Sequence, residues 1–232
     1  MTNWRNFSVM QSRTNLLVGE KNLKKLHDAK VIVFGVGGVG GYVTELLARA
    51  GVGNITIVDF DTVDISNINR QIIALNSTVG KPKTDVMHSR LNDINPNGNF
   101  VAINKKYCSE TYDDFDLSKY DWIVDAIDIV TDKIQLIVRA HTCNVNIISA
   151  MGAGNRYDVP TFKVSDIYKT YNDGLAKVLR KKLKEHGIAK HMVVFTDSLQ
   201  SYKGNTVGSI SYYPAMCGAT MAAYVVNKII EE

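Results

Sequence analysis

The feature that most limits the fold of this chain is the stretch of residues 31–40, which reads V-I-V-F-G-V-G-G-V-G. Its apolar half predicts a short strand that is buried on both faces, and the glycines end that strand abruptly. Apolar residues at three- and four-residue spacing from Val39 to Ala50 then predict a helix that packs back onto the sheet. A glycine turn between a strand and a helix N-terminus is typical of phosphate binding. The glycines of this predicted loop are Gly35, Gly37, Gly38 and Gly40.

A second apolar run, residues 55–58, ends in Asp59. An acidic residue at this distance from a glycine loop is suited to binding ribose hydroxyls. Strand-like and helix-like segments alternate through residue 150, which predicts right-handed crossovers and a mostly parallel sheet. The predicted fold class is therefore α/β and Rossmann-like, with helices on both sides of the sheet.

The predicted strands beyond residue 150, near residues 161–164 and 192–195, are too few to close a core of their own. We therefore expect one domain over residues 1–232, with a C-terminal extension that completes it. Its parts are an N-terminal arm and helix (1–29), a nucleotide-binding core (30–150), and an extension for substrate binding and dimerisation (151–232). In the first part, Leu16, Leu17, Leu23 and Leu26 are spaced to face the core.

Composition excludes several classes of protein. A chain of 232 residues can bury about 70–75% of the surface that it exposes when unfolded, so it should fold without disulfide bonds or structural metal ions. Its three cysteines lie far apart, so neither a disulfide framework nor a structural zinc site is predicted. No apolar run approaches the ~20 residues of a membrane span, and the N-terminus has no apolar signal core. We expect a soluble protein of the reducing cytoplasm that does not bind a membrane.

Two polar segments point to an anionic ligand. Residues 61–71 form a long polar loop after a strand, where parallel sheets usually hold ligand. Lys83 follows Pro82 in the first turn of a predicted helix, where the helix dipole disfavours a cation by ~0.3–1 kcal/mol. An anionic ligand explains that position, and a solvated lysine is the alternative. Asp128 follows the strand predicted at 122–124 and should reach the same crevice.

The positive charge of the chain is concentrated in one segment. Its net charge is +4, yet residues 177–190 carry six cations against the single acid Glu185. Leu175, Val178, Leu179 and Leu183 are predicted to form the buried stripe of a helix here. The cations should project outward and repel one another, which indicates an anionic partner, or else a merely solvated basic face.

Five motifs in order carry a family resemblance: G-V-G-G-V-G (35–40), V-D-F-D (58–61), S-N-I-N-R-Q (66–71), V-G-K-P-K (79–83) and D-A-I-D (125–128). They resemble the adenylating domain of the family that includes ubiquitin-activating enzymes and the molybdopterin- and thiamine-pathway adenylyltransferases. Segments 67–70, 149–155 and 166–183 are similar to the branch of that family that modifies tRNA. The resemblance covers the chain from Arg13 and is weakest between residues 197 and 214.

The resemblance implies an ATP and Mg²⁺ site. The glycine loop would hold the nucleotide and Asp59 the ribose, and Asp128 would hold the metal. The implied phosphate ligands are Asn67, Arg70 and Lys83, and the polar neighbours Asp61, Ser66 and Asn69 complete the implied nucleotide site. The implied catalytic residues are Arg70, Lys83, Asp128 and an arginine supplied by the arm of a partner subunit, for which Arg13 and Arg5 compete. The implied tRNA-binding residues are Lys177, Arg180, Lys181, Lys182 and Lys184.

The implied reaction activates the threonine carboxylate of threonylcarbamoyladenosine in tRNA as an acyl-adenylate. The neighbouring carbamoyl group then closes a ring, with net loss of water. This chemistry needs no nucleophilic side chain, so a thioester on Cys217 is not expected. The histidines have no ligand spacing and are expected at the surface or in packing. A homodimer is implied as well, and a sulfur-transfer or accessory protein is a further partner left open.

Three alternatives remain from the sequence. A nicotinamide-dependent oxidoreductase would share the glycine loop and Asp59 but has no need of Arg70 and Lys83. An adenylyltransferase for a small ubiquitin-like sulfur carrier would use the same site, although such relatives usually carry two C-x-x-C pairs that this chain lacks. The third alternative is a tRNA-binding protein whose nucleotide site is only structural.

Overall fold

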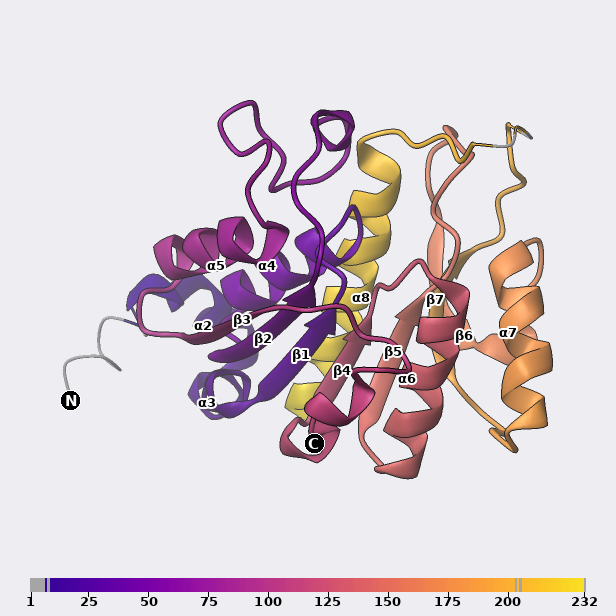
Figure 1. Cartoon of the computed structure of the whole chain (residues 1–232). Helices are drawn as coiled ribbons and strands as arrows, with labels where there is room; N and C mark the ends of the chain where they lie inside the picture. The colour runs from indigo at the N-terminus through magenta and orange to yellow at the C-terminus, as the bar shows by residue number, and fades with distance from the viewer. Residues whose placement is uncertain (1–6, 8, 203, 205, 232) are drawn as a thin grey trace.

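The structure is a computed structural model that describes residues 7, 9–202, 204 and 206–231. Its centre is a seven-stranded sheet in the order β3-β2-β1-β4-β5-β7-β6 (Figure 1). Neighbouring strands are parallel except β6, which runs antiparallel to β7. The strands are β1 (Lys30–Phe34), β2 (Asn54–Asp59), β3 (Asn99–Asn104), β4 (Trp122–Asp125), β5 (Asn146–Ala150), β6 (Phe162–Asp166) and β7 (Met192–Thr196). The predicted fold class is confirmed.

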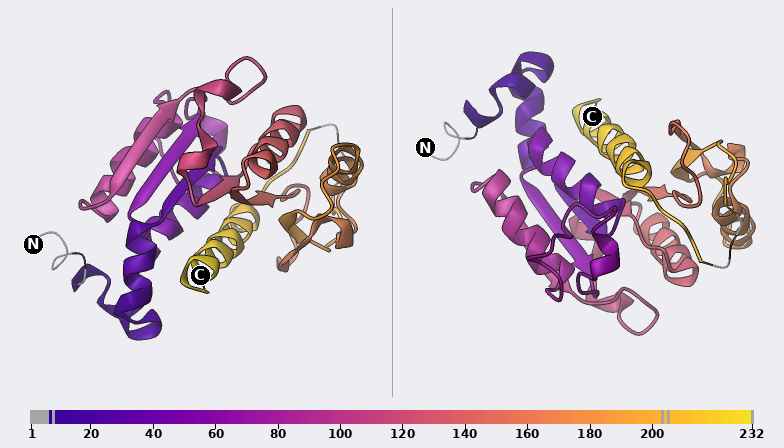
Figure 2. Two further views of the ribbon diagram at one scale, coloured as in Figure 1. Left: turned by 90° about the horizontal axis from the view of Figure 1, so that it is seen from below. Right: turned by 90° about the horizontal axis from the view of Figure 1, so that it is seen from above.

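Helices cover both faces of this sheet (Figure 2). The helices are α2 (Ser12–Val18), α3 (Glu20–Asp28), α4 (Gly40–Ala50), α5 (Lys83–Ile94), α6 (Val130–Thr142), α7 (Gly174–Glu185) and α8 (Tyr212–Glu231). One buried cluster joins the sheet to α4, α5 and α8, and the other joins it to α6 and α7. The segment after residue 150 therefore adds two strands to the same sheet and one helix to each face.

Strand β1 is buried on both sides, as its unbroken apolar run predicts. Val31 and Val33 belong to the cluster with α4 and α8, and Ile32 and Phe34 belong to the cluster with α6 and α7. Each β1 side chain therefore contributes to one of the two cores, which is the pattern of a central parallel strand.

The strand order creates a crevice beside β1. The chain leaves β1 for β2 on one side, whereas β4 pairs with β1 on the other. Connections on the two sides diverge at the carboxyl ends of such strands, which is where open α/β sheets bind ligands. Two long connections, residues 60–82 and 197–211, rise at this edge, at the top of Figure 1.

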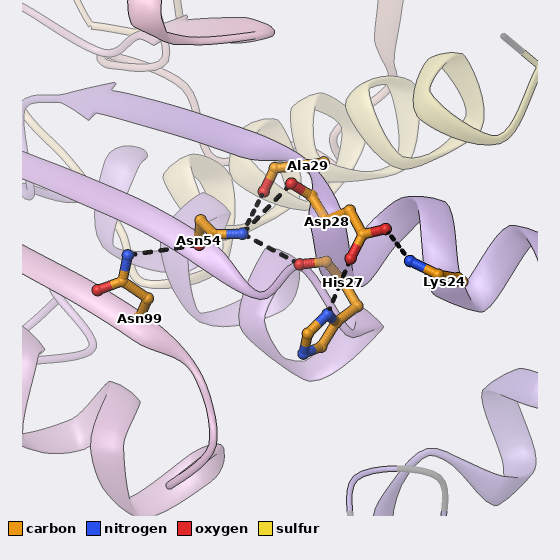
Figure 3. Close-up of polar contacts among 6 residues, drawn as sticks. All are labelled: Lys24, His27, Asp28, Ala29, Asn54 and Asn99. Carbon is orange, nitrogen blue, oxygen red and sulfur yellow. Dashed lines mark hydrogen bonds and ion pairs between the residues drawn. The ribbon is translucent and has the colours of Figure 1, made fainter. Parts of the chain in front are cut away.

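At the opposite end of the strands, polar contacts hold the C-terminus of α3 against the sheet (Figure 3). The side-chain amide of Asn54 donates to the backbone carbonyls of His27 (3.1 Å), Asp28 (3.3 Å) and Ala29 (3.3 Å). Carbonyls at a helix C-terminus lack intrahelical partners, so this amide satisfies groups that would otherwise need water. Asn99 donates to Asn54 in turn (3.4 Å), which ties the start of β3 to the same corner.

The N-terminal prediction is only half right. Leu23 and Leu26 are buried as expected, but Leu16 and Leu17 are largely exposed, and none of the described α2 residues is buried. Among the described residues, helix α2 packs mainly against α3, and Leu16 and Leu17 face solvent. Phe7 is buried instead, with its ring edge against His27. Trp4 lies outside the described residues.

The three cysteines are free, with Cys108 and Cys217 buried and Cys143 exposed. Among the described residues, none of the helices has the length and apolar character needed to cross a membrane.

Candidate active site

The glycine loop follows β1 and permits contacts that no other residue allows. Gly35 has a φ of +87°, and a Cβ there would lie 2.7 Å from the carbonyl oxygen of Ala126. A Cβ on Gly40 would lie 1.8 Å from the carbonyl oxygen of Gly35. Gly40 is therefore needed for close packing of loop and helix rather than for contact with a ligand. Val39, the N-cap of α4, makes no side-chain capping bond, so the helix start is open to an anion.

A cavity of about 750 Å³ opens at the crevice. The loops that line it follow β1 (residues 35–39), β2 (59–61), β3 (105–107), β4 (126–129) and β5 (150–154). Part of the 197–211 connection, including Thr206, Val207 and Ser209, lines it from above. The predicted residues that line it are Gly35, Gly37, Gly38, Asp59, Asp61, Ser66, Asn69, Arg70, Lys83 and Asp128. Its size suits a nucleotide or another small molecule of that bulk.

Asp59 lies at the end of β2 and holds the glycine loop. Its Oδ2 accepts a hydrogen bond from the backbone N–H of Val36 (2.6 Å), and its Oδ1 accepts one from Asp61 (2.9 Å). Sequence reasoning did not anticipate this role in shaping the loop. Each carboxylate oxygen retains a second acceptor site, so the geometry leaves room for a ribose hydroxyl.

Lys83 forms an ion pair at the wall of the cavity. Its Nζ lies 2.8 Å from Asp61 Oδ2, and its backbone N–H donates to the Asp61 carbonyl (2.9 Å). The Lys83 side chain is 7% exposed, whereas that of Asp61 is 49% exposed. Lys83 is the first residue of α5, which agrees with its predicted place in the first turn of a helix. In this structure its negative partner is Asp61.

Arg70 is held by its own loop. One guanidinium nitrogen, Nη1, donates to the carbonyl of Ser66 (2.9 Å) and to Asn69 Oδ1 (2.8 Å). Asn69 also donates from Nδ2 to the carbonyl of Ser209 (3.0 Å), which joins this loop to the 197–211 connection. The Arg70 side chain makes no other hydrogen bond within the described part of the chain, so its remaining guanidinium donors are available to a ligand.

Two predicted ligands lie away from the cavity. Asn67 ends a short 3-10 turn, Ile65–Asn67, and its Oδ1 accepts from the backbone N–H of Asp64 (3.2 Å). Asn67 is buried there and closes a capping box, so in this structure it organises the loop. Arg13 lies exposed on α2 and does not line the cavity of its own chain. Arg5 falls outside the described residues.

Several cavity residues were missed from the sequence. Lys105 and Lys106 follow β3 directly, and Lys106 lies 3.5 Å from Asp132 Oδ2 at the start of α6. Paired lysines at the end of a predicted parallel strand were the signal that could have found them. Gln71 is buried in the wall, and its Oε1 has no hydrogen-bond partner among the described protein atoms.

A buried ion pair supports the β4 end of the site. Asp125 Oδ2 and Lys133 Nζ are 2.8 Å apart, and both side chains are fully buried. Asp125 Oδ1 also accepts from the backbone N–H of Ile127 (3.1 Å), which fixes the loop that carries Asp128. Nothing in the local sequence distinguishes this structural aspartate from the ligand-facing Asp128 three residues later. Asp128 itself is exposed into the cavity.

Cys217 lies in α8 and is completely buried. Burial raises the pKa of its thiol to about 12, so almost none is thiolate near neutral pH. This agrees with the expectation that the chain forms no thioester.

Helix α7 carries the basic segment with two departures from prediction. Val178 is half exposed, because the buried stripe consists of Ala176, Leu179 and Leu183. Arg180 is half-buried and donates to the Thr170 carbonyl (2.9 Å), so it partly supports the loop before the helix. Lys177, Lys181, Lys182 and Lys184 are exposed, and Lys182 pairs with Glu185 (3.0 Å).

A glycine loop at the switch point of a parallel sheet, with cations around it, defines a nucleotide-binding α/β protein. The chain belongs to the ThiF family, whose model matches residues 11–232. It is 39% identical over 240 residues to the tRNA threonylcarbamoyladenosine dehydratase of Bacillus subtilis (strain 168), covering 95% of this chain and 94% of that protein.

Two solved structures are similar over nearly the whole chain. The Escherichia coli tRNA N6-threonylcarbamoyladenosine dehydratase TcdA in complex with AMP has a TM-score of 0.90 and 32% identity, covering 95% of this chain and 93% of that one. The same enzyme in complex with ATP has a TM-score of 0.90 and 31% identity, covering 97% and 95%. The family resemblance drawn from the motifs is therefore confirmed.

Proposed function

We propose that this protein is an ATP-dependent tRNA threonylcarbamoyladenosine dehydratase. The observation that carries the proposal is end-to-end similarity to such enzymes, together with a cavity that places Arg70 and Lys83 at a glycine loop. A nicotinamide-dependent oxidoreductase would leave these cations without a role. Activation of a sulfur carrier would use the same site and differs only in the acid that is activated.

In the first step, a substrate carboxylate oxygen attacks the α-phosphorus of ATP and pyrophosphate leaves. Two anions must approach each other, so preorganised positive charge lowers the barrier. The glycine loop and the open start of α4 would bind phosphate oxygens, and Asp59 would bind the ribose. Arg70 would use its free donors, and Lys83 would exchange its contact with Asp61 for a contact with phosphate.

The acidic residues near the phosphates suit Mg²⁺, which prefers oxygen ligands and keeps several waters. Asp128 presents an exposed carboxylate in the cavity, and the buried Asp132 also lines it, with its Oδ2 3.5 Å from Lys106 Nζ. The described residues hold no group of three or more ligand side chains, so bound ATP would complete the coordination. When bound, the ion would neutralise charge on the pyrophosphate as it leaves.

In the second step, the carbamoyl group attacks the activated acyl carbon of the same substrate and AMP leaves. The two groups belong to one molecule, so the reaction gains from proximity and needs no protein nucleophile. The substrate loses the elements of water, and ATP is converted to AMP and pyrophosphate. The buried, protonated thiol of Cys217 is consistent with this route.

The protein is also proposed to be a cytoplasmic homodimer. Val9, Met10, Leu16 and Leu17 expose apolar surface on the N-terminal segment and α2, and an isologous contact would bury that surface twice. Arg13 lies between these residues and could then reach the cavity of the other subunit.

Mass spectrometry of nucleosides digested from tRNA tests the proposed function. Incubation of the protein with ATP, Mg²⁺ and tRNA that carries threonylcarbamoyladenosine should convert that nucleoside to a product lighter by one water. Consumption of ATP only when a sulfur carrier is added would favour the adenylyltransferase alternative. Binding of tRNA without any use of ATP would favour a structural nucleotide site.

A further inference from the structure

Three exposed tyrosines lie close in the chain to residues that line the cavity. Tyr157 is 69% exposed, Tyr202 is 53% exposed and Tyr212 is 37% exposed. Tyr157 lies in the connection after β5, Tyr202 lies in the connection after β7, and Tyr212 is the first residue of α8, which follows that connection. A hydrogen bond from the Tyr212 hydroxyl to the Tyr157 carbonyl (2.5 Å) brings two of them together. We refer to Tyr157, Tyr202 and Tyr212 as the tyrosine rim.

The tyrosine rim is built on a fixed backbone. Asn155 adopts a positive φ of 61°, and its backbone N–H donates to the Gly208 carbonyl (2.8 Å). Its Oδ1 accepts from the backbone N–H of Gly208 (2.6 Å), and its carbonyl accepts from Ser201 (2.8 Å) and Tyr202 (3.2 Å). One asparagine therefore joins the two segments that carry the tyrosines.

A buried arginine extends this support to the basic helix. Arg156 is 4% exposed and donates to the carbonyls of Ser198 (2.8 Å), Gly154 (3.0 Å) and Asn172 (3.3 Å). Asn172 immediately precedes Asp173, the N-cap of α7. Arg156 thus connects the backbone of the tyrosine rim to the start of α7. Its own guanidinium is buried and bonded to carbonyls, so it supports this surface and does not contact RNA.

The rim and α7 both border the cavity. Gly154 and Val207, close to Tyr157 and Tyr202 in the chain, line the cavity, and so does Leu175 in the first turn of α7. The side chains of Lys177 and Lys184 are exposed and make no hydrogen bond or ion pair within the described part of the chain. A molecule that inserts one group into the cavity would therefore meet tyrosine faces and lysine charges just outside it.

From this arrangement we propose that the tyrosine rim stacks unpaired RNA bases next to the nucleoside in the cavity, while α7 binds the neighbouring phosphates. The inference rests on the proposed function, because it names how the tRNA substrate is held. A modified base can enter a closed cavity only when it is out of a helical stack. Where that base lies in a single-stranded loop, its neighbours are unpaired too, and aromatic side chains bind such bases whatever their sequence.

The charge of the surface favours RNA over a second copy of the chain. Residues 177–190 carry six cations against one acid, and RNA phosphates match that charge. An isologous contact centred on the rim would bring two basic helices near each other, and like charges oppose such a contact. The tyrosine rim is also remote in sequence from the apolar surface of α2.

The test compares Tyr157→Ala with Tyr157→Phe, alone and combined with Tyr202→Ala or Tyr202→Phe. Tyr157 is mostly exposed, so neither change should affect folding. Each alanine should weaken binding of the tRNA by about 5- to 150-fold, the factor that corresponds to about 1–3 kcal/mol per stacked base. Phenylalanine keeps the ring and should keep most of the affinity. Affinity for ATP should stay unchanged in every variant.

A second measurement separates this inference from the proposed function. A single-stranded RNA oligonucleotide and a duplex of the same length are titrated against the wild type and the double alanine variant. The inference requires that the wild type prefers the single strand and that the variant loses that preference. Equal tRNA affinity for alanine and phenylalanine variants would overturn it, even if the wild type dehydrates the nucleoside. Loss of dimer mass in Tyr157→Ala, with tRNA affinity unchanged, would assign the rim to a subunit contact instead.

Discussion

Replacing Lys83 tests the proposed phosphate site most directly. Its side chain is 7% exposed, so Lys83→Met keeps the apolar stem and removes only the charge. Asp61 is 49% exposed and remains solvated when its partner is lost. No unpaired charge is left buried, so we expect the free energy of unfolding to change by no more than about 1 kcal/mol.

The effect on catalysis should be much larger. Loss of one preorganised charge at the reacting phosphates should raise the barrier by about 2–4 kcal/mol, which is roughly a 30- to 1000-fold decrease in turnover. ATP–pyrophosphate exchange that depends on tRNA measures the adenylation step alone. Lys81→Met is the matched control, because Lys81 is exposed two residues earlier and uses only backbone hydrogen bonds. Turnover near wild type in Lys83→Met, with the control also active, would refute the adenylation mechanism.

Three other predictions follow from the same structure. Leu17→Glu should convert the dimer to the 25.7 kDa monomer in light scattering, and an unchanged mass would exclude α2 from the interface. Charge reversal of Lys177, Lys181 and Lys184 should weaken tRNA binding and flatten its salt dependence, whose wild-type slope in log K against log[salt] should be about −2 to −4. Burial lowers the pKa of His191 to about 3, so below about pH 6.5 the unfolded chain binds a proton that the folded chain does not. The free energy of unfolding should therefore decrease as the pH falls from 6.5 towards 3, by at most about 1.4 kcal/mol per pH unit. His191→Gln should be less sensitive to acid in chemical denaturation, and equal sensitivity would contradict the assignment.

The parts of the fold that the sequence predicts well are those set by one local signal. Strand β1 lies within one residue of its predicted place, because an apolar run that is buried on both faces is recognisable from the sequence alone. The exposure of Val178 could not be predicted, since Ala176 and Val178 fit the helical stripe almost equally well. Only the packing of α7 against Ile167 and Ile188 selects between them.

The candidate site shows a similar division. The motif S-N-I-N-R-Q places five polar side chains close together in one loop. Their spacing alone does not reveal which of them faces the cavity. The structure turns Arg70 and Asn69 inward and uses Asn67 to close the turn. Lys133 was hidden because an ion pair buried within the core leaves no pattern in the local sequence.

The charges of the cavity explain why two of its cations, Lys83 and Lys106, are paired with acids of its lining in this structure. Its lining contains four cations, Arg70, Lys83, Lys105 and Lys106, and four acids, Asp59, Asp61, Asp128 and Asp132. Only some of these acids can give up a partner at low cost. Asp59 is fixed by two backbone N–H groups, whereas Asp61 is half exposed and regains water when Lys83 leaves it. A triphosphate can therefore take Lys83 from Asp61 while the glycine loop keeps its shape, which is the exchange that the proposed mechanism requires.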